Sequence, residues 1–519
     1  MINRKQILVE NTLWVYLAKI VMQLISLIAS VLVLRQLDVD VYGTYVFLFG
    51  LFTAYQLLIT SPLKHVLTRF VPELRNKVAP SSLLKLVMMY VVIALVMVIV
   101  LTGLGVAFKD SLSQLFNIDT LDAHFKAFLF FVFSYSIKIL LEVLLSALLL
   151  HRRIAILNMV LALCRALAYI ILLERLNVNL LLLIEGCVSL IYSLPALFVF
   201  LNGVKKEDNG KELVTSRDKH RMQRFWLYSL FTELGAGLIG RTSDYYIVAA
   251  FSSPYFIGLY GFAVKIYELF YKVLPLKEFE SVLKPLVFDR FNSTTDHHQL
   301  NSFYNFSIKV LLPVFILPFA YFLCFGEEVI LLLFGAKYLD AYWPTVIILG
   351  GFITNGLFYP LSIFIHLKEK MHILLFSRLV VVFSLFAGIY MMKSYGISGV
   401  AIATIFGELI KNILMFFLFR SYVKIHYDRR VFISNLFLIL TLIVFIYPLH
   451  LILSRWSLLV TGSILFSIIY LLFIINCHAL RAKELAYLES IIQSNPKMAI
   501  LYDKFWRLLN KLAIRKVHE

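Results

Sequence analysis

The chain has 519 residues, of which 61% are hydrophobic and 15% are charged, whereas soluble domains carry about 45–50% apolar and about 25% charged residues. This composition excludes a soluble globular protein and a disordered chain, and it predicts an integral membrane protein. The net charge of +18 would indicate nucleic acid in a soluble domain. In a membrane protein it indicates basic cytoplasmic loops, so we expect no nucleic-acid partner.

Sequence motifs for catalysis and metal binding are missing. The four cysteines lie in or beside apolar runs, and no two of them form a CxxC pair, so we expect neither a disulfide framework nor a metal site. The sequence has no Walker P-loop, no HExxH zinc motif and no GxSxG nucleophile motif. We therefore expect no catalytic residue, no metal and no cofactor, and a gradient-driven carrier rather than an enzyme.

Fourteen apolar runs follow one another along the chain, and each is close to the roughly 20 residues that a spanning helix needs. They cover residues 13–34, 42–62, 83–107, 124–150, 154–173, 178–201, 225–250, 256–276, 303–325, 343–366, 372–392, 397–422, 431–451 and 456–476. The predicted fold class is an all-α polytopic membrane protein with about fourteen transmembrane helices.

The basic residues favour one orientation of these spans. If the N-terminus is cytoplasmic, 33 of the 49 Lys and Arg residues lie in cytoplasmic segments and seven lie in outer loops. Lys and Arg accumulate on the cytoplasmic side of membrane proteins. We therefore predict that both termini are cytoplasmic.

A charged segment at 202–224 divides the spans into six and eight. It predicts a six-helix lobe at 1–201, a cytoplasmic linker at 202–224, a second six-helix lobe at 225–422 and two additional helices at 423–476. The tail at 477–519 is basic, and residues 498–516 have an apolar and a basic face. Such a helix binds anionic membrane lipid or docks on the bundle, and the sequence leaves both open.

Two short segments indicate an internal repeat. Residues 42–45 are Tyr-Gly-Thr-Tyr and residues 257–260 are Ile-Gly-Leu-Tyr, and each opens a span after a short polar turn. Gly43 and Gly258 are 215 residues apart. This offset favours two similar bundles, as in many transporters.

The same segments carry a family resemblance. LRQLDVDVYGTYVF, RTSDYYIVAAFSSPYFIGLYGFAVKIYELF, FGAKYLDAYWPTVIIL and YGISGVAIATIFGELIKNILMFFLF resemble the polysaccharide-flippase branch of the multidrug/oligosaccharidyl-lipid/polysaccharide exporter superfamily. Residues 37–40 are Leu-Asp-Val-Asp and lack the Gly-Pro often found there.

The resemblance implies a transporter of two six-helix lobes in the bacterial inner membrane. Its cargo would be an undecaprenyl-diphosphate-linked oligosaccharide for O-antigen, lipopolysaccharide or exopolysaccharide, moved from the inner to the outer leaflet. The implied partners are membrane lipid, a coupling cation (H⁺ or Na⁺), and polysaccharide polymerase and chain-length proteins.

Charged residues inside the predicted spans are the candidate site residues, because a charge facing lipid costs about 2.5–3.5 kcal/mol at a helix centre. Nine basic and six acidic residues lie there, and the basic excess suits an anionic cargo such as a diphosphate. The candidates for substrate binding are Lys138, Arg165, Arg241, Lys265, Lys19 and Arg378. The alternative is internal pairing and snorkelling at helix ends.

Five acids are candidates for cation coupling or for charge pairing, and they are Glu142, Glu233, Asp244, Glu268 and Glu408. On an unbroken helix, Glu233, Arg241 and Asp244 share one face. In the following span Lys265 and Glu268 share a stripe, and Tyr side chains there could stack on sugars or simply pack.

Two other functions stay open. A multidrug or other small-molecule exporter of the same fold would have fewer cations in its cavity. A membrane-embedded polysaccharide polymerase or ligase would need an acceptor site in a sizeable outer loop, and the longest predicted outer loop covers only residues 108–123.

Overall fold

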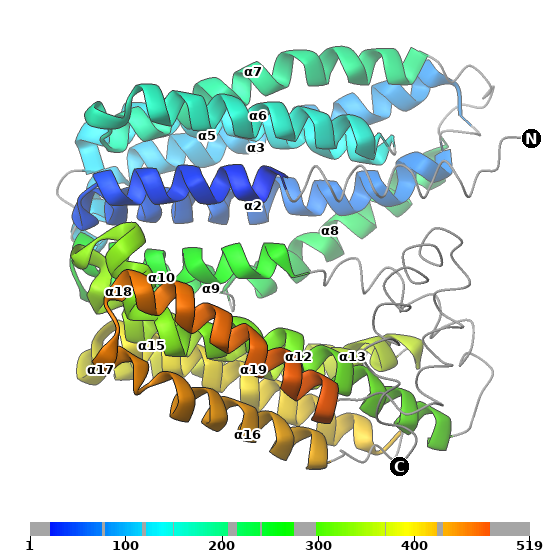
Figure 1. Ribbon diagram of the computed structural model, residues 1–519. Coiled ribbons are helices and arrows are strands. Elements are labelled where there is room, and N and C mark those ends of the chain that lie inside the picture. Colours follow the sequence, from blue (N-terminus) through cyan, green and yellow to red (C-terminus); the bar gives the residue numbers. More distant parts are fainter. Residues whose placement is uncertain are drawn as a thin grey trace, which may run out of the picture. The chain divides into compact units, whose positions relative to one another are not determined.

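The computed structural model describes residues 21–74, 78–116, 121–148, 150–205, 215–238, 241–274, 297–368, 370–422 and 429–477. These ranges contain helices and no β-strand, and Figure 1 shows many of them as long rods. Lys19, residues 206–214 of the predicted linker and the amphipathic tail lie outside the described residues.

The described helices follow one another with short connections. After a helix at Val21–Gln36 come α2 (Val39–Leu74), α3 (Pro80–Ala107), α4 (Lys109–Phe116), α5 (Leu121–Ala147), α6 (His151–Ile171), η1 (Leu173–Arg175), α7 (Val178–Lys205), α8 (Ser216–Leu238), α9 (Arg241–Phe251), α10 (Pro254–Val273), α12 (His297–Val329), η2 (Ile330–Phe334), η3 (Ala336–Ala341), α13 (Tyr342–Leu367), α14 (Met371–Leu379), α15 (Val381–Arg420), α16 (Arg429–Ile446), α17 (Leu449–Ile452), α18 (Arg455–Ser457), η4 (Leu458–Gly462) and α19 (Ser463–Cys477).

Ten described segments are long and apolar enough to cross a membrane, and one of them, His372–Arg420, contains two of the predicted spans. Gly396 separates these two spans, because its φ of 57° is a backbone conformation that favours glycine. The other three predicted spans correspond to Val21–Gln36, to α8 with α9, and to α10. The all-α polytopic fold class is therefore confirmed.

One face of α6 shows that the surroundings are apolar. Ile156, Val160, Leu163, Leu167 and Ile170 recur at helical spacing and are each 44–57% exposed. A continuous exposed apolar stripe of this kind is unusual on a soluble monomer and is expected where a helix faces lipid. The protein is a multi-pass membrane protein.

Helix α2 extends twelve residues beyond the predicted end of its span at 62. The extension alternates buried apolar side chains, such as Val66 and Phe70, with exposed Lys64, His65 and Arg69. Because this pattern has helical spacing, the helix continues as an amphipathic rod. The hydropathy of the span ends at its first charges, which is why the sequence prediction stopped too early.

The chain divides into two compact units. The first contains Met1–Leu269, Leu333–Pro344 and Leu385–Thr404. Within it α5 packs on α7, α6 on α7, and α2 on both α5 and α8, and Figure 1 shows α3, α5, α6 and α7 running side by side. The lobe boundaries predicted from the sequence stay a prediction.

The second unit contains Phe270–Leu332, Thr345–Ser384 and Ile405–Glu519. Here α12 packs on α16, and α16 packs on α19. Its core is apolar and includes Phe325, Leu361, Phe364 and Leu438, all at most 2% exposed. Burial of such side chains contributes about 1.5–3 kcal/mol each.

Gly43 and Gly258, the glycines of the two repeated segments, each pack against the backbone of the other segment within the first unit. Helices α2 and α10 begin at Val39 and Pro254, which are 215 residues apart like the glycines. A β-carbon on Gly43 would overlap the carbonyl oxygen of Pro254, and one on Gly258 would overlap the carbonyl oxygen of Val39. The contact is therefore reciprocal, as between two copies of one chain around a two-fold axis.

Candidate functional site

The polar face of α6 carries an ion pair into the interior of the first unit. A guanidinium nitrogen of Arg165 lies 2.9 Å from Glu185 Oε2 on α7. The hydroxyl of Tyr169, one turn after Arg165, donates a hydrogen bond of 2.7 Å to the other carboxylate oxygen of Glu185. Residues four apart on a helix share a face, so α6 presents Arg165 and Tyr169 to the same acid.

The ion pair of Arg165 and Glu185 is largely buried, so its loss would destabilise the protein. The Glu185 side chain is only 5% exposed and that of Arg165 is 27% exposed. A buried carboxylate without its cation would cost several kcal/mol. Nε of Arg165 is buried and has no hydrogen-bond partner in the described part of the chain.

A pocket of about 100 Å³ opens beside the pair. Two cations line it, Arg165 and Lys265, and so does one acid, Glu185. Its other polar side chains are hydroxyls, from Ser26, Ser30, Tyr42, Tyr45 and Tyr169. The pocket therefore offers hydrogen-bond donors and two positive charges against one negative charge. It is formed by Val21–Gln36, α2, α6, α7 and α10, five segments that a sequence pattern does not bring together.

A second ion pair lies on α5. Lys138 Nζ is 2.6 Å from Glu142 Oε2, one turn further along the helix, and Asn158 donates to the other Glu142 oxygen at 3.3 Å. The Lys138 ammonium also lies 5.4 Å and 5.3 Å from the ring centroids of Tyr135 and Tyr192, within the range of a cation–π contact. Lys138 and Glu142 thus form a pair, which fits the internal-pairing alternative for these two residues.

Asp244 on α9 is 2% exposed and accepts two hydrogen bonds from hydroxyl groups. Tyr260 Oη donates to Oδ2 at 2.7 Å, and Thr404 Oγ1 donates to Oδ1 at 2.9 Å. These donors bring α9, α10 and α15 together within the first unit. The side chain of Arg241 lies outside the described residues, so its predicted pairing with Asp244 stays a prediction.

Glu233 has a different partner from Asp244, because its carboxylate lies 3.1 Å from His65 Nε2 on the extended part of α2. The face predicted for Glu233, Arg241 and Asp244 assumed one unbroken helix. The structure describes α8 to Leu238 and α9 from Arg241, so the shared face stays a prediction.

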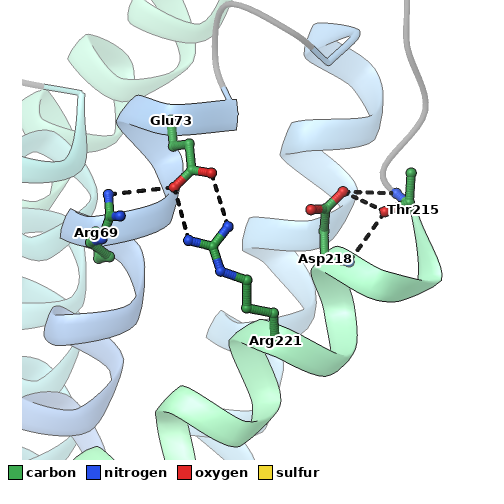
Figure 2. A network of polar contacts seen from close by, with 5 residues as sticks. All are labelled: Arg69, Glu73, Thr215, Asp218 and Arg221. Carbon is green, nitrogen blue, oxygen red and sulfur yellow. Dashed lines mark hydrogen bonds and ion pairs between the residues drawn. The ribbon is translucent and has the colours of Figure 1, made fainter.

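A further charged cluster joins the end of α2 to the start of α8 (Figure 2). Arg221 binds both carboxylate oxygens of Glu73 at 2.9 Å and 3.4 Å, and Arg69 lies 3.4 Å from the same acid. Thr215 and Asp218 exchange hydrogen bonds at the beginning of α8, as in a capping box. The cap explains why α8 begins inside the segment predicted as a linker.

The remaining candidates are scattered. Glu268 is exposed on α10, in the first unit, while exposed Arg378 and partly buried Glu408 belong to the second. Among the described residues no group of three or more His, Cys, Asp or Glu could hold a metal ion. Sequence reasoning omitted Glu185 and Tyr169 from the candidate site, although Arg165 and Tyr169 are spaced by one helical turn.

Solved structures with a similar fold include a flippase and a multidrug transporter. The chain is similar to a solved structure of the lipid II flippase MurJ in an inward closed conformation, with a TM-score of 0.68 and 13% identity over 90% of this chain and 98% of that one. It is also similar to an inward-facing multidrug resistance MATE family transporter of the MOP superfamily, with a TM-score of 0.57 and 12% identity over 78% of this chain and 94% of that one. These identities show a shared fold, which is of the flippase and multidrug-transporter type.

Comparisons of sequence identify a narrower group than the shared fold does. No curated protein matches the chain. A family model described as polysaccharide biosynthesis protein matches residues 8–274, which is more than half of the chain and includes the pocket around Arg165 and Lys265. The chain belongs to the polysaccharide biosynthesis protein family.

Proposed function

We propose that the protein translocates an undecaprenyl-diphosphate-linked oligosaccharide across the bacterial inner membrane by alternating access, with both termini in the cytoplasm. The observation that carries the proposal is the pocket in which Arg165 and Lys265 meet hydroxyl side chains. Membership of a polysaccharide biosynthesis family supports a saccharide cargo, and the flippase-type fold supports transport rather than catalysis.

In this proposal the pocket receives the diphosphate. Arg binds phosphate oxygens through two parallel N–H groups, and Lys acts as a point charge. Glu185 and Tyr169 position the guanidinium, while the unpartnered Nε of Arg165 supplies a donor. A volume of about 100 Å³ equals the space of about three water molecules, so it suits a phosphate group and requires opening for the attached sugars.

The acids take two different roles. Glu142 and Glu233 lie beside cationic or ionisable partners, Lys138 and His65, and we assign them to pairing. Asp244 is buried and accepts hydrogen bonds from the hydroxyls of Tyr260 and Thr404, and it is our candidate for binding a coupling H⁺ or Na⁺. Arg241, Lys19, Arg378, Glu268 and Glu408 stay proposals for binding or coupling. Polymerase and chain-length proteins are the proposed partners that use the translocated O-antigen, lipopolysaccharide or exopolysaccharide unit.

The decisive experiment is lipid analysis by mass spectrometry in cells that lack the gene. We expect an undecaprenyl-diphosphate oligosaccharide to accumulate on the inner leaflet, and expression of the wild-type protein should clear it. Lys265→Glu reverses a charge in the pocket and should not clear it. Lys85→Glu makes the same change on an exposed residue of α3 and should clear it at matched abundance.

Two results would overturn the proposal. One is normal lipid composition in the deletion strain. The other is full clearance by Lys265→Glu, because an anionic cargo requires the positive pocket. Sensitivity of the deletion strain to small toxic molecules, without lipid accumulation, would instead favour an exporter, the function named for the MATE structure of the same fold.

A further inference from the structure

His450 connects two helices of the second unit through both nitrogens of its ring. Nδ1 lies 3.0 Å from Glu328 Oε1 on α12, and Nε2 lies 2.9 Å from the carbonyl oxygen of Cys324, one turn earlier on the same helix. His450 itself stands on α17, a single helical turn between α16 and α18. The ring therefore links this short turn to α12.

The acid of this pair is buried and the base is partly open. The Glu328 side chain is 10% exposed, and that of His450 is 29% exposed. The second carboxylate oxygen of Glu328 is buried and has no hydrogen-bond partner among the described residues. Burial of an ionised carboxylate with one oxygen lacking a hydrogen bond raises the free energy of the site. A proton on Glu328, or on the His450 ring beside it, lowers that free energy.

Counting donors and acceptors shows that the pair requires a proton. A backbone carbonyl only accepts hydrogen bonds, and so does an ionised carboxylate. With an ionised Glu328, both contacts need N–H groups, which makes His450 an imidazolium. With a neutral His450, Nε2–H serves Cys324 and Nδ1 must accept from a protonated Glu328. In both arrangements the pair is neutral overall and holds one proton between Oε1 and Nδ1.

Removal of that proton leaves the pair with a charge of −1 and one broken contact. A lone pair of the ring then faces either the carboxylate or the carbonyl oxygen. An unsatisfied buried acceptor is unfavourable, so α17 would lose one of the two contacts that the His450 ring makes with α12. The partial exposure of His450 provides the route by which the proton enters and leaves.

Other titratable groups nearby do not replace this proton. Glu327 on α12 is exposed, Arg455 on α18 is exposed, and the ring centroid of Tyr447 lies 6.2 Å from that of His450. The buried thiol of Cys324 is the remaining group. In the described part of the chain, none of them forms an ion pair with Glu328 or His450. The described parts of α16 and α19 carry their charged residues only at Arg429 and Arg430, at the start of α16.

We propose that Glu328 and His450 form a proton-binding site, and that the bound proton fastens α17 to α12. In the orientation predicted from the basic residues, this end of both helices faces the outside of the cell. The site therefore responds to external pH. It goes beyond the proposed transport function and does not depend on it, because the ligand is a proton and the response is a local change of structure.

The test is hydrogen–deuterium exchange of the full chain in lipid nanodiscs, followed by mass spectrometry of the segment 447–457. Amides of Leu451 and Leu453 in this segment donate to backbone carbonyls and report its opening. Exchange is compared at about pH 6 and about pH 9, on either side of the range in which histidine ordinarily titrates, after correction for intrinsic rates. We expect protection in the wild type to fall about tenfold or more at the higher pH, as for loss of one charge-assisted hydrogen bond.

Three variants decide between this site and a general effect of pH. Glu328→Gln supplies a permanent N–H donor to Nδ1 of a neutral His450, so protection should be the same at both pH values. Glu327→Gln removes the neighbouring exposed acid and should keep the wild-type response. His450→Gln has no titratable ring and should also remove the response, which covers the case in which Glu328→Gln does not fold.

A pH-independent wild type would overturn the proposal. The proposal also fails if Glu328→Gln and His450→Gln retain the full response, or if Glu327→Gln abolishes it. None of these results bears on lipid accumulation in the deletion strain, so the failure of this inference and the failure of the proposed function are distinguishable.

Discussion

Helix α2 makes two different kinds of contact at its two ends. Near its start, Gly43 meets the backbone of Pro254 so closely that no side chain fits between them. Near its end, Glu73 meets α8 through the long side chain of Arg221, with side chains 26% and 50% exposed. The first contact joins backbone to backbone, and the second joins two flexible groups in contact with solvent.

The difference shows how much movement each end tolerates. A backbone carbonyl cannot turn away from an added β-carbon, so the glycine contact exists at one separation only. An exposed ion pair follows small displacements by changing rotamers, and it stabilises by about 0–1 kcal/mol. The glycine end therefore fixes the position of α2 against α10, while the Glu73 end holds α8 loosely.

We expect the largest loss of stability from breaking the buried ion pair of Arg165 and Glu185. This variant tests whether burial makes an ion pair contribute more to stability than an exposed pair does. Arg165→Ala leaves Glu185 buried without a cation, and we expect a loss of about 3–5 kcal/mol in the free energy of unfolding. Thermal unfolding of the purified protein measures it. The double variant Arg165→Leu/Glu185→Leu should recover much of the loss, because no buried charge remains. A loss below about 1 kcal/mol for Arg165→Ala would place this pair with the exposed ones.

The second-largest loss of stability is expected from substitutions at the glycine contact. Gly43→Ala and Gly258→Ala each place a β-carbon against a backbone oxygen, and overpacking of this kind costs about 1–3 kcal/mol. Because the contact is reciprocal, both variants should be destabilised. Gly103→Ala is the matched control, since nothing lies within 4 Å of its added carbon. A loss in only one of the two variants would contradict the reciprocal contact, and an equal loss in the control would contradict its tightness.

The smallest effect belongs to the exposed cluster in Figure 2. Glu73→Gln removes the acid that Arg69 and Arg221 share, and we expect a loss of at most about 1 kcal/mol. High salt should weaken the wild type by a similar amount and leave the variant unchanged, because salt screens exposed charges. A loss above about 2 kcal/mol that is independent of salt would remove the contrast between the two ends.

Much of the fold follows from the sequence because lipid imposes strong constraints. Runs of about 20 apolar residues and the shared offset of Gly43 and Gly258 predict the helices and the repeat without any knowledge of packing. The extension of α2 to Leu74 was not predicted, since hydropathy does not register an amphipathic helix that leaves the membrane.

The candidate site was only partly predictable. A charge in a span signals a buried group, which identified Arg165, Lys265 and Asp244. The ion-pair partner of such a charged residue depends on which helices are neighbours. The partner of Arg165 is Glu185, which is 20 residues further along the chain, on the next helix. His450 and Glu328 are separated by more than 100 residues and lie near span ends, where a polar residue is ordinary. No periodic pattern connects such pairs.

The two ends of α2 belong to one rod, and its length gives it leverage. Gly43 and Glu73 are thirty residues apart on the same helix, which is about 45 Å at 1.5 Å per residue. A tilt of roughly 5° about the glycine end would displace the Glu73 end by roughly 4 Å if the rod stays straight. A rotation of this size at the tight end would move Glu73 by more than the 2.9 Å that separates it from Arg221, and the flexible side chains of the exposed pair would have to follow that movement.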